Sequence, residues 1–310
     1  MTEINTTAVL GAGVIGASWT ALFAAAGMDV RVFDVSPSAE ADVNAYVDNA
    51  WPTLLELGLA KQGRKGQITF HDSAAEAVTS AQFIQENVPE QIEIKHAMFT
   101  EIEAHLLPEA VVCSSASGLM VREMQQGWKD PSRFLLGHPF NPPHLIPLVE
   151  LLGNDLTDDD AINVAEAFYR AVGKVTIRVQ KEVPGHVANR LQAALWREAI
   201  HLVESGVATV EDLDKAVWAG PGLRWAAMGP HMLFNLGAGP GGMEEFCNRY
   251  TASFHRWWDD LGAPKLTPEL AGKLGLGVNK EAGGKSVTDL SAQRDALITG
   301  MLKANSKVRD

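Results

Sequence analysis

An uncharged run from Ala8 to Met28 constrains this chain more than any other feature. Its 21 residues are long enough to cross a bilayer. However, Gly11, Gly13 and Gly16 interrupt the run, and the residues before it include an acid but no Lys or Arg. We therefore predict no membrane span and no signal peptide. The run divides instead into a strand at residues 8–10, a glycine-rich turn and a helix that ends before Gly27.

The turn has the pattern G-x-G-x-x-G, and Asp34 follows Gly16 by 18 residues, at the end of a second predicted strand over residues 30–34. In a dinucleotide site the first glycine allows the tight turn, the second lets the backbone approach the pyrophosphate, and the third lets helix and strand pack closely. Asp34 would accept hydrogen bonds from the adenosine ribose and repel a 2′-phosphate. This pattern favours NAD over NADP, with FAD and a non-binding glycine turn as alternatives. The cofactor-binding residues predicted from it are Gly11, Gly13, Val14, Ile15, Gly16 and Asp34.

Further strand-like segments alternate with helical patterns up to residue 183, at 82–85, 110–113, 134–137, 148–152 and 175–179. One helix is expected to begin with a capping box, Thr157 with Asp160, and to stop at Gly173. This alternation predicts an α/β, Rossmann-type, doubly wound, mainly parallel sheet.

After Pro184-Gly185 the sequence predicts helices alone, one of them capped by Thr209 with Asp212 and another over 286–307. We expect two domains, an NAD-binding domain at residues 1–183 and an all-helical domain at 184–310. The helical domain is expected to bind substrate and to form a homodimer.

Acidic residues outnumber basic ones by 38 to 26, which gives a formal net charge of −12. This balance argues against nucleic acid and anionic membranes as partners. Cys113 and Cys247 are too few for a disulfide framework, so we expect reduced thiols and a cytoplasmic location. No metal site is expected.

His138 and Glu150 are candidates for acid–base chemistry, because the histidine ends one predicted strand and the glutamate lies in the next. A neutral imidazole can take the proton of an alcohol as its hydride leaves, and a carboxylate behind the ring can fix its tautomer. From spacing alone, a histidine close to prolines is as well explained as a turn or core residue.

Several ordered motifs resemble the 3-hydroxyacyl-CoA dehydrogenase family, over residues 8 to about 260. Besides the glycine turn with Asp34, they are Glu86-Asn87-Val88-Pro89-Glu90 with Lys95, Ser114-Ser115-Ala116-Ser117-Gly118-Leu119, His138-Pro139-Phe140-Asn141-Pro142, Leu148-Val149-Glu150 and Pro184-Gly185-His186-Val187-Ala188-Asn189-Arg190.

The resemblance implies site roles residue by residue. His138 would be the general base in oxidation and Glu150 its orienting partner. Ser117 and Asn189 would hydrogen-bond the reacting oxygen. Glu90, Lys95 and Asn141 would contact the nicotinamide half of NAD, although Glu90 can also be read as a helix N-terminal acid and Lys95 as a solvated lysine. His144 is expected to be a turn residue.

The substrate is less well defined. The family's CoA enzymes carry a lysine-rich segment after the second strand, whereas the matching region here has no base until Lys61, Arg64 and Lys65. The aromatic closing strand of the CoA enzymes is also missing. These departures favour a small free 3-hydroxy acid over a CoA thioester.

Two groups within the family resemble the chain further. The Asn141-Pro142-Pro143 segment is similar to the L-gulonate 3-dehydrogenase (lambda-crystallin) group, and Gly222-Leu223-Arg224-Trp225 to the L-carnitine 3-dehydrogenase group. Carnitine-type members tend to have Asp at the position of Asn189, so the first reading is a gulonate-like acid. The alternatives are L-carnitine, a 3-hydroxyacyl-CoA and a non-catalytic crystallin-like protein. Substrate contacts are expected from aromatic faces and basic forks at Phe140, Arg190, Trp196, Arg224 and Trp225.

Overall fold

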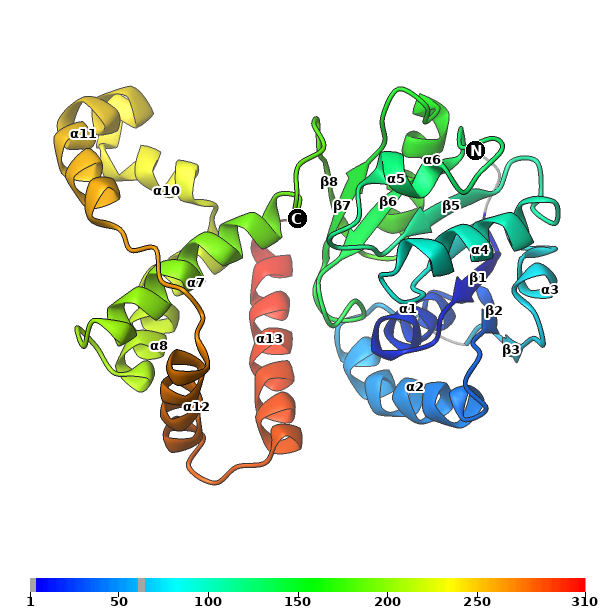
Figure 1. Cartoon of the computed structure of the whole chain (residues 1–310), viewed down its shortest axis with the longest axis horizontal. Helices are drawn as coiled ribbons and strands as arrows, with labels where there is room; N and C mark the ends of the chain where they lie inside the picture. Colours follow the sequence, from blue (N-terminus) through cyan, green and yellow to red (C-terminus); the bar gives the residue numbers. More distant parts are fainter. Residues whose placement is uncertain (1–3, 61–64, 310) are drawn as a thin grey trace. The chain divides into compact units, whose positions relative to one another are not determined.

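An eight-stranded sheet in the order β3-β2-β1-β4-β5-β6-β7-β8 forms the centre of the first part of the chain (Figure 1). The computed structural model describes residues 4–60 and 65–309, with side chains through residue 305. The strands are β1 (Thr6–Leu10), β2 (Asp29–Phe33), β3 (Ile68–Phe70), β4 (Phe83–Glu86), β5 (Val111–Ser114), β6 (Phe134–Pro139), β7 (Leu148–Leu152) and β8 (Val175–Arg178). All neighbours are parallel except β6 and β7. The predicted doubly wound, mainly parallel sheet is therefore confirmed.

Helices cover both faces of this sheet and divide its core in two. One face packs against α1 (Val14–Ala25), α2 (Ala39–Glu56) and α6 (Asp159–Ala171) around Trp19, Phe23 and Tyr169. The other packs against α3 (Ala74–Val78), α4 (Ile92–Glu103) and α5 (Val121–Gln125) around Phe99 and Phe134. Both cores consist of closely packed apolar and aromatic side chains, so the sheet is a rigid support for residues at its ends.

Two sequence predictions in this unit are wrong. Strand β3 was not predicted, because its three residues are too short to show a period. The capping box of Thr157 with Asp160 does not form, since α6 begins after Asp158. The Thr157 hydroxyl is buried and instead donates to the carbonyl oxygen of Phe134 at 3.1 Å, so a tertiary contact replaces the local cap.

The chain divides into two compact units between Asn189 and Arg190. The described residues of the second unit form no strand, as predicted. Its helices are the greater part of α7 (Ala188–Glu204), then α8 (Val210–Ala219), α9 (Pro221–Ala227), α10 (Pro230–Gly237), a 3₁₀ turn at Gly239–Gly241, α11 (Gly242–Asp260), α12 (Pro268–Ala282) and α13 (Val287–Arg309). The predicted cap of α8 is present, because the Thr209 hydroxyl accepts from the N–H of Asp212 at 3.1 Å.

No helix of the described residues is long and apolar enough to cross a membrane. The uncharged run at the start of the chain forms β1, the glycine turn and α1.

Candidate active site

The glycine turn between β1 and α1 has the geometry that close packing requires. Gly11 has φ +83°, a conformation that favours glycine, and a Cβ there would lie 2.7 Å from the backbone of Asn87. A Cβ on Gly16 would lie 1.9 Å from the carbonyl oxygen of Gly11. At Gly13, by contrast, a Cβ would have no atom within 4 Å. Two glycines therefore serve the fold, and the third leaves open space over the turn.

That open space lies at the start of α1, where Gly13 and Val14 are exposed and Ile15 is partly buried. The first turn of α1 contains no acidic residue, and no side chain caps its N–H groups. Free N–H groups and the positive end of a helix dipole bind phosphates well. The turn thus fits a dinucleotide pyrophosphate.

Asp34, at the end of β2, is held beside this turn. One carboxylate oxygen accepts from the N–H of Ala12 at 2.5 Å and the other from the N–H of Ser36 at 2.8 Å. The carboxylate is partly exposed, so it can also receive a ribose hydroxyl. Its contact with the ribose stays a prediction.

The antiparallel pair β6 and β7 places His138 directly opposite Glu150. His138 Nδ1 lies 2.8 Å from Oε2 of Glu150, and the two residues are 5% and 0% exposed. A carboxylate acceptor keeps the proton of a neutral imidazole on Nδ1 and leaves Nε2 as a base. The predicted pair is therefore brought together in the geometry of an oriented general base.

The second oxygen of Glu150 is also occupied. Oε1 accepts from the N–H groups of Val187 and Ala188 at 2.9 and 3.0 Å. Burial alone would raise the pKa of Glu150, but the hydrogen bonds from His138, Ala188 and Val187 outweigh it and hold this pKa below its ordinary value. Glu150 is thus an anion with both of its carboxylate oxygens hydrogen-bonded.

Ser117 follows β5, in a turn that Glu90 organises. The Ser117 hydroxyl donates to one oxygen of Glu90 at 2.8 Å, while the N–H groups of Ser117, Gly118 and Leu119 donate to the other. Burial opposes ionisation, yet these hydrogen bonds lower the pKa of Glu90. The structure therefore brings Ser117 and Glu90 together, and their contacts with cofactor or substrate stay predictions.

Lys95 was expected to contact the nicotinamide half of NAD, with a solvated lysine as the alternative. It is 1% exposed, and its ammonium lies 2.6 Å from Glu86 and donates to the carbonyl oxygen of Val88 at 3.2 Å. Glu86, also fully buried, accepts from the N–H of Val88 and the hydroxyl of Ser114. The ion pair joins α4 to the end of β4, and the hydrogen bond from Ser114 joins the ends of β4 and β5. The reading of Lys95 as a solvated lysine is wrong, and its contact with the cofactor stays a prediction.

The segment between β6 and β7 carries Phe140, Asn141 and His144. Phe140 lies edge-on to His138, with ring centroids 5.9 Å apart, and Asn141 is exposed. His144 is buried, and its Nδ1 lies 2.9 Å from the Ser18 hydroxyl. His144 is a structural turn residue, as predicted.

Lys174 also binds the segment between β6 and β7. Its Nζ donates to the carbonyl oxygens of Pro143 and Ile146, the latter at 2.9 Å, and lies 4.9 Å from the ring centroid of Trp19. Burial lowers the pKa of Lys174 to about 7. The loop after His138 is therefore fixed by an interior amine.

The other predicted substrate residues lie on helices of the second unit, apart from Asn189 in the first turn of α7. Arg190 and Trp196 are exposed on α7, and Arg224 and Trp225 are exposed on α9. Contacts between these residues and His138 stay predictions.

His186 is the residue of this region that the sequence did not single out. It is 2% exposed, and its ring centroid lies 5.2 Å from that of His138. Its φ of +50° makes it the one non-glycine residue with a positive φ in the described part of the chain. Both ring nitrogens are buried and make no hydrogen bond of normal geometry among the described residues, although the backbone of Ala116 lies close enough to oppose the lowering of the pKa. A polar residue directly after Pro184-Gly185 was a weak signal, because burial against His138 depends on the tertiary structure.

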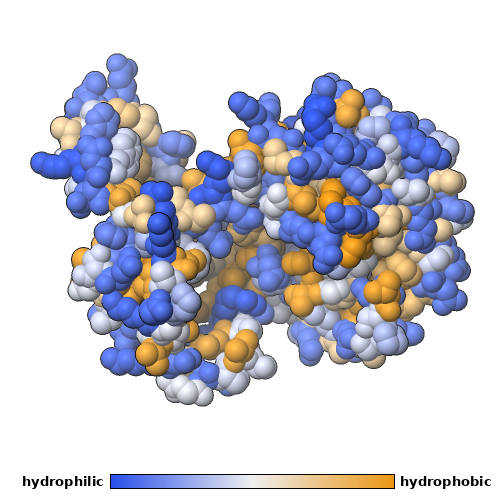
Figure 2. Space-filling model, viewed as in Figure 1, coloured by the Kyte–Doolittle hydropathy of each residue, from blue (hydrophilic) through white to orange (hydrophobic). Residues whose placement is uncertain are grey.

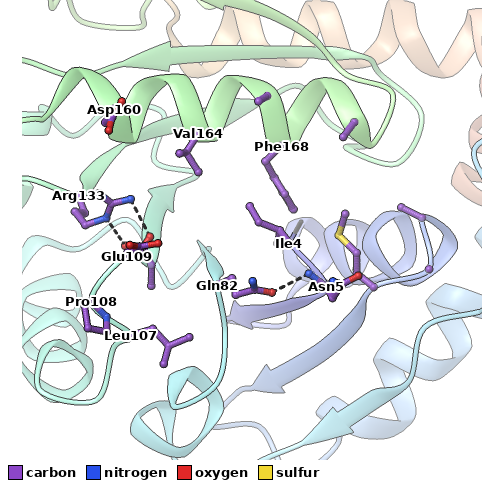
Figure 3. Close-up of a pocket in the computed structure, with 16 residues that line it drawn as sticks. Ile4, Asn5, Gln82, Leu107, Pro108, Glu109, Arg133, Asp160, Val164 and Phe168 are labelled. Carbon is purple, nitrogen blue, oxygen red and sulfur yellow. Dashed lines mark hydrogen bonds between the residues drawn. The ribbon is translucent and has the colours of Figure 1, made fainter. Parts of the chain in front are cut away.

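A hollow of about 890 Å³ lies at the opposite ends of the strands (Figure 3). It is lined by residues at the amino ends of β1, β4, β5 and β6 and by one face of α6, among them Asn5, Gln82, Glu109, Arg133 and Phe168. None of the predicted site residues lines it. Ligands of doubly wound sheets bind at the carboxyl ends of the strands, so we assign the chemistry there. The described residues contain no cluster of His, Cys, Asp and Glu able to hold a metal ion.

Together the glycine turn and the oriented His–Glu pair define a dinucleotide-dependent oxidoreductase. Comparison with known proteins identifies the family. Residues 6–183 match the NAD-binding domain of 3-hydroxyacyl-CoA dehydrogenase and residues 185–284 match the C-terminal domain of the same family. The chain belongs to the 3-hydroxyacyl-CoA dehydrogenase family, and it is an NAD-dependent oxidoreductase acting on CH–OH groups.

Similar proteins of known name cover nearly the whole chain. L-carnitine dehydrogenase of Streptomyces coelicolor is 43% identical over 99% of this chain and 96% of its own length. L-carnitine dehydrogenase of Pseudomonas putida is 40% identical over 98% and 95%. Among solved structures, an NAD⁺-dependent 5-formyl-3-hydroxy-2-methylpyridine 4-carboxylic acid 5-dehydrogenase is 28% identical, with a TM-score of 0.85 over 99% of this chain and 100% of that one.

Proposed function

We propose that this chain is an L-carnitine dehydrogenase that oxidises the 3-hydroxyl group of L-carnitine with NAD⁺. The observation that carries the proposal is full-length identity of about two residues in five to L-carnitine dehydrogenases from several bacteria, for example 43% and 40%. The sequence motifs alone favoured an L-gulonate-like acid and kept carnitine as an alternative. The relatives support that alternative better than the first reading.

The geometry of His138 supports the proton-transfer half of the reaction. Bound NAD⁺ would accept the hydride from the carbon that carries the hydroxyl group. His138 Nε2 takes the hydroxyl proton as the C=O bond forms, and the anionic Glu150 stabilises the resulting imidazolium. In the reverse direction the same proton returns to the oxygen.

The rest of the proposed site is assembled from residues around this pair. Asp34 would select NAD through the ribose, and Glu90 and Asn141 would contact the nicotinamide half. Phe140 supports a cationic substrate, because an aromatic face beside His138 can bind a trimethylammonium group. Arg190 or Arg224 would pair with the substrate carboxylate, and Trp196 or Trp225 would add further aromatic surface.

A CoA thioester is less well supported. Of the three bases in the matching segment, Lys61 and Arg64 lie outside the described residues. Lys65 lies 4.8 Å from the ring centroid of Trp51 and 4.0 Å from Asp48. It therefore already has partners of its own.

A substrate panel tests the proposal. Purified protein is given NAD⁺ with L-carnitine, D-carnitine, L-gulonate, 3-hydroxybutyrate or 3-hydroxybutyryl-CoA, and NADH formation is followed by absorbance. We expect the highest kcat/KM with L-carnitine and no turnover after His138→Ala. A higher kcat/KM for another acid would overturn the carnitine proposal. Full activity of His138→Ala would overturn the mechanism, and absence of any turnover would favour the non-catalytic, crystallin-like alternative.

We also propose that the helical unit forms a homodimer. None of the residues of α8, α9, α10 and α11, all of them described, is buried. Large apolar side chains there are exposed, including Trp218, Met232, Trp257 and Trp258. Figure 2 shows hydrophobic and pale residues mixed with hydrophilic ones on this part of the chain. Exposed apolar surface of this extent is typical of an oligomer interface. Sedimentation equilibrium should give twice the chain mass, and a monomer at micromolar concentration would refute the dimer.

A cytoplasmic location is proposed as well. Both cysteines are free, Cys113 buried and Cys247 exposed, which suits a reducing compartment.

A further inference from the structure

We propose that His186 is a second catalytic imidazole, whose ring N–H donates a hydrogen bond to the reacting oxygen of the substrate beside His138. The inference rests on the proposed function as a dehydrogenase of a 3-hydroxy acid. In this proposal two histidines contact the alcohol oxygen: His138 acts as the base and His186 as a hydrogen-bond donor.

The first argument is the position of the ring. The ring centroids of His186 and His138 are 5.2 Å apart, with their planes inclined by 51°, and both side chains are buried. Nδ1 of His138 is taken by Glu150, so its reactive nitrogen is Nε2. A separation of this size lets one oxygen atom bridge a nitrogen of each ring.

The second argument is that His186 makes no well-formed hydrogen bond. Its two ring nitrogens are buried, and the polar group beside them, the backbone of Ala116, does not meet hydrogen-bond geometry. Buried polar atoms without a well-formed hydrogen bond are rare and costly. A neutral imidazole offers one donor and one acceptor. Burial, together with the nearby His138, lowers the pKa of His186 and so favours the neutral ring. A hydroxyl group that accepts from this ring and donates to His138 satisfies both residues.

The third argument concerns the donor that the reaction needs. Ser117 and Asn189 were expected to hydrogen-bond the reacting oxygen, but the hydroxyl proton of Ser117 is directed to Glu90. His186 would therefore act beside Asn189 in the place expected for Ser117. A donor is required because negative charge grows on the oxygen as its proton goes to His138 and its carbon loses a hydride. His186 supplies one without giving up its own proton.

The fourth argument is that the backbone conformation fixes the position of the His186 ring. His186 adopts φ +50° immediately after Gly185, which has φ +74°. The next two N–H groups, of Val187 and Ala188, bind Glu150. One left-handed turn therefore aims the ring of His186 at His138 and also fixes the carboxylate behind His138.

Two substitutions that tolerate a positive φ test the proposal. His186→Gly removes the donor, and His186→Asn keeps an amide donor, while both residues adopt left-handed backbone readily. On the best acid of the substrate panel we expect kcat of His186→Gly to fall by about 10²–10³-fold, as for loss of one oxyanion donor, and His186→Asn to retain more activity. NAD affinity by calorimetry and the unfolding transition should change little in both.

Chemical rescue separates a donor from a packing role. Added imidazole should restore turnover of His186→Gly, whereas thiophene, an apolar ring of similar size, should not. A kcat of His186→Gly within about threefold of the wild type, or equal rescue by thiophene, would overturn the proposal. The identity of the best acid tests the carnitine proposal separately, because the ratio of variant to wild type is measured on whichever acid is oxidised. A wild type that oxidises none of the acids would overturn both.

Discussion

Replacing Glu150 with glutamine removes one charge behind His138 and keeps the size of the side chain. Oε1 of Glu150 accepts from two backbone N–H groups, of Val187 and Ala188, at 2.9 and 3.0 Å. The glutamine oxygen will keep these two bonds, because turning the amide would bring its NH₂ group against two donors in a buried site. Its NH₂ group then faces Nδ1 of His138, which must become an acceptor.

An acceptor at Nδ1 puts the proton of the neutral ring on Nε2, so the base is lost without a change of shape. The same exchange of tautomer in a serine-protease triad lowers kcat by about 10⁴-fold. We expect a fall of that order in the rate of hydride transfer, or about 5.5 kcal/mol in activation free energy. The assay is single-turnover NADH formation with saturating NAD⁺ and the preferred acid.

Glu166→Gln is the matched control. Glu166 is also hydrogen-bonded, to Arg178 and Thr176 on β8, but neither of these residues binds His138 or Glu150, so its loss should leave the rate unchanged. A fall of less than about tenfold in Glu150→Gln, with the fold intact by circular dichroism, would refute the tautomer argument.

The same variant has a second readout in stability. The pKa of Glu150 is lower in the folded chain than its ordinary 4.5, so this carboxylate stabilises the fold fully above that value. The contribution is lost as the pH falls through the lower, folded value. Urea unfolding at a series of acidic pH values should therefore show a smaller acid destabilisation in Glu150→Gln than in the wild type.

Three further predictions concern Asp34, the glycine turn and the buried Lys174. Asp34→Ser should weaken NAD binding by about 10–150-fold, the value of a charge-assisted hydrogen bond, and raise the preference for NADP relative to NAD, as measured by calorimetry. Gly13→Ala should weaken NAD binding but leave the free energy of unfolding unchanged. Gly16→Ala should lower the free energy of unfolding, because its Cβ would lie 1.9 Å from the carbonyl oxygen of Gly11. Equal unfolding midpoints for the two variants would contradict this prediction. Lys174 should make stability rise with pH between about 7 and 10.5, since the folded chain binds fewer protons there than the unfolded one, and Lys174→Met should remove that slope in urea titrations.

Features that depend on local chemistry were predictable from the sequence. The glycine turn needs residues without a Cβ at fixed positions, and the structure shows close approaches at Gly11 and Gly16. The opposed positions of His138 and Glu150 follow from two adjacent strands. Strand segments bounded by turns gave the sheet, apart from the short β3.

Features that depend on distant contacts were not predictable. Thr157 reads as a cap, yet its hydroxyl binds the carbonyl of Phe134 from another strand. Lys95 was expected at the nicotinamide, with a solvated position as the alternative, yet it lies buried in α4 against Glu86 at the end of β4. The sequence assigned no role to His186, because its contact is with the ring of His138, 48 positions earlier. The partners of Thr157 and His186 are remote in sequence, and Lys95 meets Glu86 only when α4 packs against β4, so no local pattern records these contacts.

The antiparallel pairing of β6 and β7 also bears on how the site is assembled during folding. His138 and Glu150 are 12 residues apart, so their contact needs closure of only a short loop. Val187 and Ala188 lie 37 and 38 residues from Glu150, and they reach it only after α6 and β8 have been added. Short loops close sooner than long ones, so the base and its carboxylate are expected to meet early. The second anchor of that carboxylate, and with it the full acid–base geometry, is then among the last parts of the sheet unit to form.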